Sequence, residues 1–134
     1  MNYDFKKAHE HFTARNAFTT GPHELLGMID HKADIVIVDV RLPSDFRKGH
    51  VPGAVNLPKG RWEKGADAAG LSKDKLNVLY CYNQQCHLAS EAAELLVKQG
   101  YPVIEMEGGF ATWEAFNQPV ELRNPPVEAL QQAA

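Results

Sequence analysis

The four residues Ile35-Val36-Ile37-Val38 constrain the fold more than any other feature of the chain. They are all β-branched and apolar, and no polar residue alternates with them. A strand with one face in water alternates, whereas an unbroken apolar run is typical of a strand buried on both faces, as in a parallel sheet. We therefore predict a strand over residues 35–40, with helices covering both of its faces.

Two further runs extend this sheet. Asn77–Tyr80 and Pro102–Met106 have the composition of buried strands, and Val55–Leu57 can add a short one. Between the first two lies a helix over Leu88–Gln99, with Gly100 as its C-terminal stop. Strand, helix and strand within about thirty residues form a βαβ unit with a right-handed crossover. The pattern predicts an α/β fold with a mostly parallel sheet.

Three more helices are expected. The first covers about residues 4–14, the second begins at Thr20 or Gly21, and the last begins near Phe110. In the second, Pro22 falls in the first turn, where a missing N–H costs nothing. A chain of 134 residues suits one domain with its own core.

Charge and hydropathy exclude several classes of partner. The net charge is −3, and the Lys and Arg residues form no basic stripe, so we expect neither nucleic acid nor a membrane as partner. No run is long enough to span a bilayer, and the N-terminus lacks the apolar core of a secretory signal. These features predict a cytoplasmic protein.

The strongest candidate for chemistry is Cys81, which directly follows the strand ending at Tyr80. Ligands of open α/β sheets bind beyond the C-terminal ends of the strands. The loop of residues 82–87 leads from Cys81 into the next helix, whose free N–H groups and dipole favour an anion. Such a position is expected to lower the pKa of the thiol and to favour the nucleophilic thiolate.

Other interpretations of the two cysteines stay open. Cys81 can be a core residue at a strand end, and Cys86 a small residue near a helix start. Cys81, Cys86 and His87 can belong to a zinc site, although no second cysteine pair exists in the sequence. The two thiols can also act as a redox pair, with Cys86 resolving an oxidised or persulfidated Cys81.

Several other residues have structural interpretations. Asp39 and Arg41 are expected to form an ion pair that fixes the loop after the first strand. His50 is expected to anchor a turn through a hydrogen bond. Gly108-Gly109 is expected to form a tight turn that opens the last helix.

Four motifs, in order along the chain, resemble the rhodanese (sulfurtransferase) family. They are Asp39-Val40-Arg41 with Asp45-Phe46 and Gly49–Pro58; Val78–Cys81; Ala92–Leu96 with Gly100-Tyr101; and Glu107–Trp113. The resemblance implies a rhodanese-like three-layer fold with a central, mostly parallel sheet flanked by helices. It covers residues 20–117, which leaves 1–19 as an N-terminal helical extension and 118–134 as a C-terminal tail.

The resemblance also implies an activity. Members of the family move sulfane sulfur from a donor such as thiosulfate to a thiophilic acceptor, through a cysteine persulfide. It implies Cys81 as the carrier, with Cys86 as the alternative or resolving cysteine. The substrate-binding residues implied are Tyr82, Asn83, Gln84, Gln85, Cys86, His87 and Arg41, and the structural ones are Asp39, Asp45, His50, Gly108 and Gly109. The expected partners are a small sulfur donor and a thiol or protein acceptor, with no cofactor and no metal.

The loop departs from the family pattern. Many members have Cys-x-x-Gly-x-Arg, whereas residues 82–87 contain neither Gly nor Arg, and the loop is about two residues longer. An anionic donor would then need Arg41 or another arginine. A binding or thiol redox-sensing module without turnover is the alternative function. A phosphatase of similar fold would need Arg at position 87, which is His87. Residues 1–19 can pack on the domain or form half of a homodimer contact.

Overall fold

The computed structural model describes residues 1–122 and contains a five-stranded sheet. Its strands lie in the order β1-β5-β4-β2-β3, and every neighbouring pair is parallel. Their bounds are β1 (Thr19–Thr20), β2 (Ile35–Asp39), β3 (Val55–Asn56), β4 (Leu76–Tyr80) and β5 (Val103–Met106). The predicted parallel sheet is therefore confirmed, and β4, which leads to Cys81, is its central strand.

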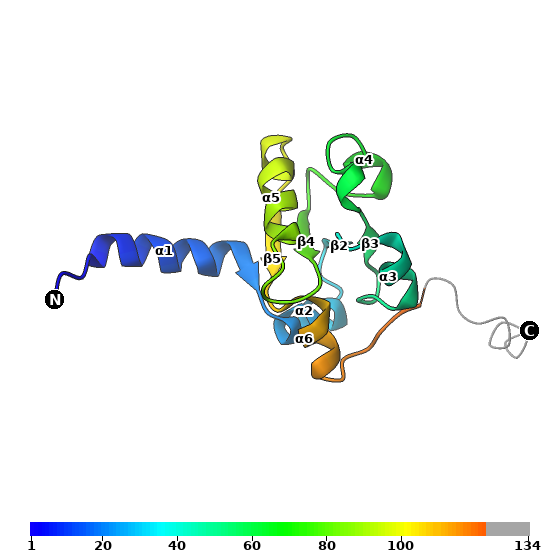
Figure 1. The fold of residues 1–134 in the computed structure, drawn as a ribbon, viewed down its shortest axis with the longest axis horizontal. Coiled ribbons are helices and arrows are strands. Elements are labelled where there is room, and N and C mark those ends of the chain that lie inside the picture. Colours follow the sequence, from blue (N-terminus) through cyan, green and yellow to red (C-terminus); the bar gives the residue numbers. More distant parts are fainter. Residues whose placement is uncertain (123–134) are drawn as a thin grey trace, which may run out of the picture.

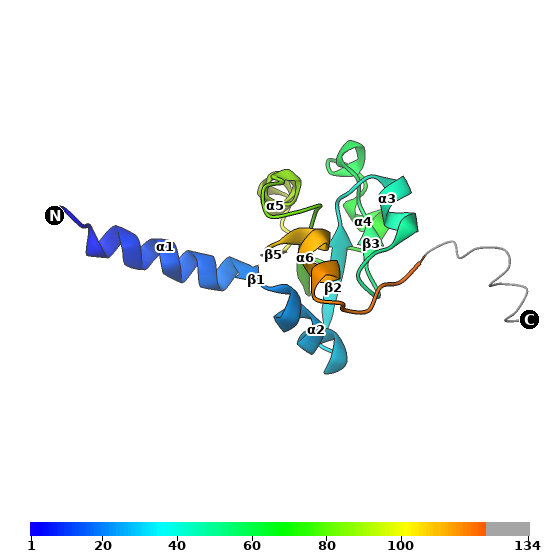
Figure 2. The same cartoon turned by 60° about the horizontal axis from the view of Figure 1, so that its bottom comes forward.

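Helices cover both faces of this sheet (Figures 1 and 2). Their bounds are α1 (Phe5–Phe18), α2 (Pro22–Asp30), α3 (Pro43–Lys48), α4 (Ala66–Ala69), α5 (Leu88–Lys98) and α6 (Gly109–Ala115), with a 3₁₀ turn at Lys59–Arg61. One core cluster joins the sheet to α4 and α5, and the other joins it to α2, α3 and α6. The predicted α/β class with three layers is confirmed.

The strands divide their side chains between the two cores, as the period of two requires. In β4, Leu79 faces the α5 side, while Val78 and Tyr80 face the α2 and α6 side. Val38 and Ile37 of β2 divide in the same way. Burial on both faces explains why these runs lack alternation in the sequence.

Four short elements were not predicted from the sequence. They are β1, α3, the 3₁₀ turn and α4. Each is only one or two turns of helix or two residues of strand, too short to show a period. In α3 the core anchor is the single side chain Phe46, which is 2% exposed.

Helix α1 is longer than predicted and extends away from the domain (Figures 1 and 2). Its N-cap, Asp4, accepts a hydrogen bond from the backbone N–H of Lys7 at 3.0 Å, which satisfies one free donor of the first turn. No residue of α1 is buried. Within the described residues, no helix is long and apolar enough to cross a membrane.

The described end of the chain returns to the domain. The indole N–H of Trp113 donates to the carbonyl of Pro119 at 2.7 Å, and Glu121 pairs with His50 in an antiparallel bridge. Only residues 118–122 of the predicted tail are therefore described, and they wrap back. Residues 123–134 of that tail lie outside the described residues.

Candidate active site

The loop from β4 to α5 holds both cysteines at the C-terminal edge of the sheet (Figure 1). Cys81 is 2% exposed, and its thiol lies 3.4 Å from the carbonyl oxygen of Cys86, to which it donates. Cys86 is half-buried, and both thiols are reduced. The structure thus brings the two candidate cysteines together.

Ionisation differs between the two thiols, and it reverses the prediction for Cys81. Burial, together with the hydrogen bond to Cys86, raises the pKa of the Cys81 thiol. Burial also opposes ionisation of Cys86, but donation from Cys81 and from the N–H groups of Tyr82 and Leu88 outweighs it and lowers the pKa of Cys86. The prediction of a lowered pKa at Cys81 is therefore wrong, because the loop folds over that thiol. The environment favours ionisation of Cys86 over ionisation of Cys81.

Backbone N–H groups face the pair from both ends of the loop. Those of Tyr82 and Ala89 favour ionisation of Cys81, and those of Tyr82 and Leu88 favour ionisation of Cys86. Leu88 and Ala89 open α5, where N–H groups lack partners within the helix. N–H groups at the start of α5 therefore favour ionisation of both thiols, and at Cys81 burial outweighs them.

Hydrogen bonds within residues 83–86 and to Gly108 fix the conformation of the middle of the loop. The Asn83 side chain accepts from the N–H of Gln85 at 3.0 Å, and the Asn83 carbonyl accepts from the N–H of Cys86 at 3.1 Å. Gln84 accepts from the N–H of Gly108 at 2.6 Å. His87 is exposed at the N-terminus of α5. Of the predicted substrate-binding loop residues, the N–H groups of Gln85 and Cys86 are thus used inside the loop.

The start of α6 fastens the loop from the other side. The N–H of Phe110 donates to the carbonyl of Cys81 at 2.8 Å, and that of Ala111 donates to the carbonyl of Tyr82 at 2.9 Å. Gly108 and Gly109 have φ values of +86° and +64°, which favour glycine. The predicted tight turn before the last helix is confirmed, and it also holds the cysteine loop in place.

Hydrogen bonds of Tyr82 with Asp45 and Leu42 tie the start of the cysteine loop to the segment around α3. The Tyr82 hydroxyl donates to the Asp45 carboxylate at 2.6 Å and accepts from the N–H of Leu42 at 3.1 Å. Burial and this carboxylate raise the pKa of Tyr82, so its hydroxyl keeps its proton. The sequence predicted a structural role for Asp45 but not this partner, because no local pattern links two residues so far apart.

Asp39 and Arg41, at the C-terminal end of β2, form a buried ion pair. Arg41 donates to both oxygens of Asp39, the shortest contact being 2.7 Å, and to the carbonyl of Gly49 at 2.6 Å. The Tyr80 hydroxyl also donates to Asp39, at 2.7 Å. The predicted ion pair is confirmed. The bonds to Asp39 and Gly49 engage Nε and Nη2 of the guanidinium, and contact of Arg41 with the donor stays a prediction.

His50 anchors the turn after α3, as predicted. Its Nδ1 lies 2.7 Å from the carbonyl oxygen of Phe46, and its ring stacks on that of Phe46 with centroids 3.8 Å apart. It is 1% exposed. This burial gives the residue a structural role and keeps it away from solvent.

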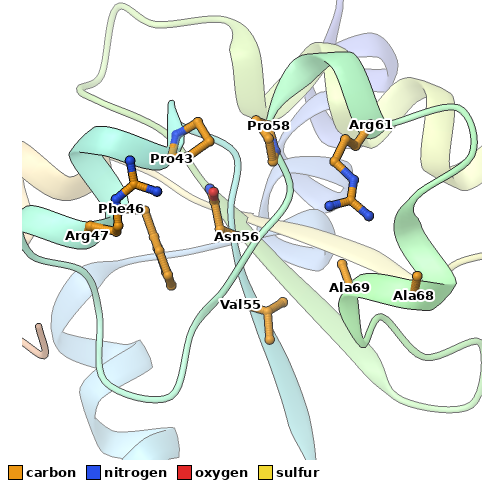
Figure 3. A pocket seen from close by; sticks show the side chains of 9 residues that line it. All are labelled: Pro43, Phe46, Arg47, Val55, Asn56, Pro58, Arg61, Ala68 and Ala69. Atoms are coloured by element: carbon orange, nitrogen blue, oxygen red, sulfur yellow. The ribbon is translucent and has the colours of Figure 1, made fainter. Parts of the chain in front are cut away.

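A cavity of about 480 Å³ lies at the β3 edge of the sheet, between α3 and α4 (Figure 3). The side chains of Arg47 and Arg61 line it together with Asn56, and Figure 3 shows both guanidinium groups turned toward the space between them. No residue of the 81–87 loop lines it. Neither arginine therefore replaces the one missing from the loop. Within residues 1–122, no three His, Cys, Asp or Glu side chains gather as a metal site.

A thiol pair at the C-terminal edge of a five-stranded parallel sheet, in a loop that feeds a helix, defines a class of small α/β domains built around a cysteine loop. The family model described as "Rhodanese-like domain" matches residues 21–116. The chain belongs to this family.

Curated relatives agree with this assignment. Thiosulfate sulfurtransferase GlpE of Pseudoalteromonas translucida is 33% identical over 105 residues, covering 73% of this chain and 90% of that protein. HTH-type transcriptional regulator Rv0324 of Mycobacterium tuberculosis is 31% identical over 88 residues, covering 66% of this chain. The matched part is only 38% of that regulator's length.

Solved structures show the same fold. Protein BH2092 of Bacillus halodurans superposes with a TM-score of 0.80 at 28% identity, over 89% of this chain and 87% of that one. The rhodanese-like domain of the Alr3790 protein of Anabaena superposes with a TM-score of 0.69 at 28% identity, over 81% and 84%. The predicted rhodanese-like fold is confirmed.

Proposed function

We propose that this domain is a sulfurtransferase that carries sulfane sulfur as a persulfide on Cys81, with Cys86 as its base. The observation that carries the proposal is the contact between the two cysteines at the start of α5: the buried Cys81 thiol donates to the carbonyl of Cys86 at 3.4 Å, and the pKa of Cys81 is raised while that of Cys86 is lowered. The relative named thiosulfate sulfurtransferase supports the reaction class.

The transfer begins with a proton. Cys86, as thiolate, takes the proton of Cys81, whose thiol already points toward that residue. The Cys81 thiolate then attacks the outer sulfur of the donor, the donor's sulfur–sulfur bond breaks, and the leaving group departs with the electron pair. With thiosulfate the leaving group is sulfite, and with a persulfide it is a thiolate. No electron acceptor is needed, because the sulfur is transferred at its existing oxidation level.

The N–H groups of Tyr82 and Ala89 stabilise the anionic persulfide on Cys81 in the same way that they favour its thiolate. A thiophilic acceptor, such as a thiolate or cyanide, then attacks the outer sulfur and releases the Cys81 thiolate. Cys86 returns the proton and the pair is restored. The two thiols thus have different tasks in one cycle.

The composition of the loop bears on the donor. Residues 82–87 contain no Lys or Arg, and Arg41 is committed to Asp39. A dianion such as thiosulfate gains most from a cation at the site, because charge-assisted hydrogen bonds are the strong ones. We therefore expect a persulfide of low charge to be a better donor than thiosulfate.

Steady-state turnover tests the proposal. Sulfur transfer to cyanide is followed as thiocyanate, with thiosulfate or cysteamine persulfide, which has no net charge, as donor, for the unaltered chain and for Cys81→Ser and Cys86→Ser. We expect turnover with both donors and a higher kcat/KM with the persulfide. Cys81→Ser should abolish turnover and Cys86→Ser should slow it. Loss in Cys86→Ser alone would move the carrier to Cys86, and no turnover with either donor would refute the proposal.

The same thiol pair favours one second candidate, a redox sensor that forms a Cys81–Cys86 disulfide. The Cys81 thiol lies 3.4 Å from the Cys86 carbonyl, the pKa of Cys86 is lowered, and the thiolate is the form that reacts with oxidants. Mild treatment with hydrogen peroxide, followed by intact mass, tests this. A loss of two hydrogens without sulfur turnover would favour the sensor, and two unchanged thiols would exclude it.

A further inference from the structure

Helix α1 presents an unusual amount of apolar surface for a segment of a small domain. It has 14 residues, none of them buried, and Phe5, Phe12 and Phe18 are 79%, 53% and 62% exposed. An isolated helix of this length is marginal in water. Its stability therefore calls for another surface.

The residues of α1 follow a pattern that suits pairing with another helix. Phe5, Ala8, Phe12 and Arg15 recur at spacings of three and four, which is the pattern of one face of a helix that packs against a second. Arg15, at the base, binds Glu107 of the domain at 2.9 Å. The N-terminal part of α1 extends away from the domain (Figure 2), and none of its residues is buried.

A groove lies at the base of the same helix, between α5 and the β1–β5 edge of the sheet. It has a volume of about 650 Å³ and includes the apolar side chains Phe18, Ala93, Val97, Val103 and Ile104. Val97 is 57% exposed, so the groove is open to solvent.

Two carboxylates make this groove acidic. Glu94 and Glu105 line it beside a single cation, Lys98. Within the described residues, neither glutamate has an ion-pair partner. Burial together with nearby Glu107 raises the pKa of the half-buried Glu105, and a cation placed in the groove would favour the charged carboxylate again. The groove therefore suits an apolar segment that also carries positive charge.

We propose that the occupant of the groove is the N-terminal half of α1 from a second copy of the chain. Lys6 and Lys7 follow Phe5 directly, so this end of the helix is both apolar and basic. It matches the acidic, apolar groove in charge and in character. A chain cannot fill its own groove, because α1 leaves the domain at Phe18, which lines it.

Antiparallel pairing of two α1 helices would cover the exposed face of each helix and fill the groove at the base of each. With Phe12 of the two copies near the two-fold axis, Phe5 of each reaches the level of Phe18 of the other, and so of the groove that Phe18 lines, since thirteen residues span roughly 20 Å along a helix. The contact is self-complementary and closed, as two-fold dimers require. Two helix faces and two grooves are covered together.

Sedimentation velocity on the full chain, from 1 to 200 µM, tests the proposal. We expect a concentration-dependent dimer in which Phe5→Asp, Phe12→Asp and Val97→Asp each weaken self-association at least tenfold. Phe116→Asp, which changes an exposed aromatic outside the patch, should leave it unchanged. Circular dichroism and urea unfolding of each variant check that the sheet domain is folded.

A charge exchange distinguishes this dimer from other associations. Lys6→Glu with Lys7→Glu should weaken the dimer, and Glu94→Lys with Glu105→Lys should weaken it as well. Mixing these two variants should restore a heterodimer, since each of its two grooves then faces a helix end of opposite charge. A chain that stays monomeric throughout the concentration range would overturn the proposal. So would a monomer whose α1 binds anionic lipid vesicles, because the helix would then serve a lipid surface.

Discussion

A Cβ atom on Gly109 would lie 2.8 Å from the carbonyl oxygen of Cys81 and 2.6 Å from the backbone nitrogen of Asn83. The start of α6 therefore rests directly on the backbone of the cysteine loop. The same carbonyl accepts the N–H of Phe110 at 2.8 Å. The position of the thiol at the end of β4 thus depends on a glycine in a different part of the chain.

Gly109→Ala should therefore disturb the loop. The φ of +64° alone should cost the alanine variant about 1–3 kcal/mol, and the close contacts add to that. We expect a lower free energy of unfolding in urea and loss of sulfur uptake. Gly27→Ala is the matched control, because nothing lies within 4 Å of its added Cβ. Equal effects of the two substitutions would contradict this account of the loop.

Tyr82→Phe should weaken the attachment of the cysteine loop to the segment around α3. The change removes the 2.6 Å bond to Asp45 and leaves the N–H of Leu42 without its acceptor. We expect a loss of about 1 kcal/mol of stability and a raised KM for the donor. Steady-state kinetics and urea unfolding check this. An unchanged KM would show that the bond does not shape the donor site.

The buried pair of Asp39 and Arg41 should matter far more for stability than a surface pair. Arg41→Ala leaves a carboxylate that is fully buried, so we expect a loss of about 3–5 kcal/mol. Lys75→Ala breaks an exposed pair with Asp34 at 3.0 Å and should cost less than about 1 kcal/mol. Urea unfolding of Arg41→Ala and Lys75→Ala gives the two losses of stability. Equal losses would contradict a dominant role for the buried pair.

The pH dependence of sulfur uptake should follow Cys86. Its pKa is lowered, so the thiolate base forms, and uptake rises, below the ordinary ionisation range of a cysteine near pH 9.0. In Cys86→Ser the remaining thiol is Cys81, whose pKa is raised, so the rising limb should move to higher pH. Stopped-flow rates from pH 5 to 10 measure both limbs. A limb that stays in place in the variant would exclude Cys86 as the base.

Much of the fold could be predicted because its signals are local. The unbroken apolar run of β2 and the period of α5 each lie within one segment, so the parallel sheet and its crossover followed. Helix α3 escaped because a six-residue helix with one core anchor, Phe46, has no detectable period. Strand β1 is two residues long and depends on its neighbour β5.

The site could be predicted in its position but not in its chemistry. Cys81 follows a strand and precedes a helix, which placed the thiols correctly. Its pKa depends on how far the loop folds over it, and loop closure involves Gly109 and Asp45, which are distant in sequence. Burial and long-range contacts of this kind leave no pattern near the cysteine.

Intact-protein mass after mixing the reduced chain with glutathione persulfide tests the central claim most directly. We predict a gain of one sulfur atom in the unaltered chain and in Cys86→Ser, and none in Cys81→Ser. A reductant should remove the added sulfur. Retention of the gain in Cys81→Ser with its loss in Cys86→Ser, or no gain in any sample, would contradict the assignment of Cys81 as the sulfur carrier.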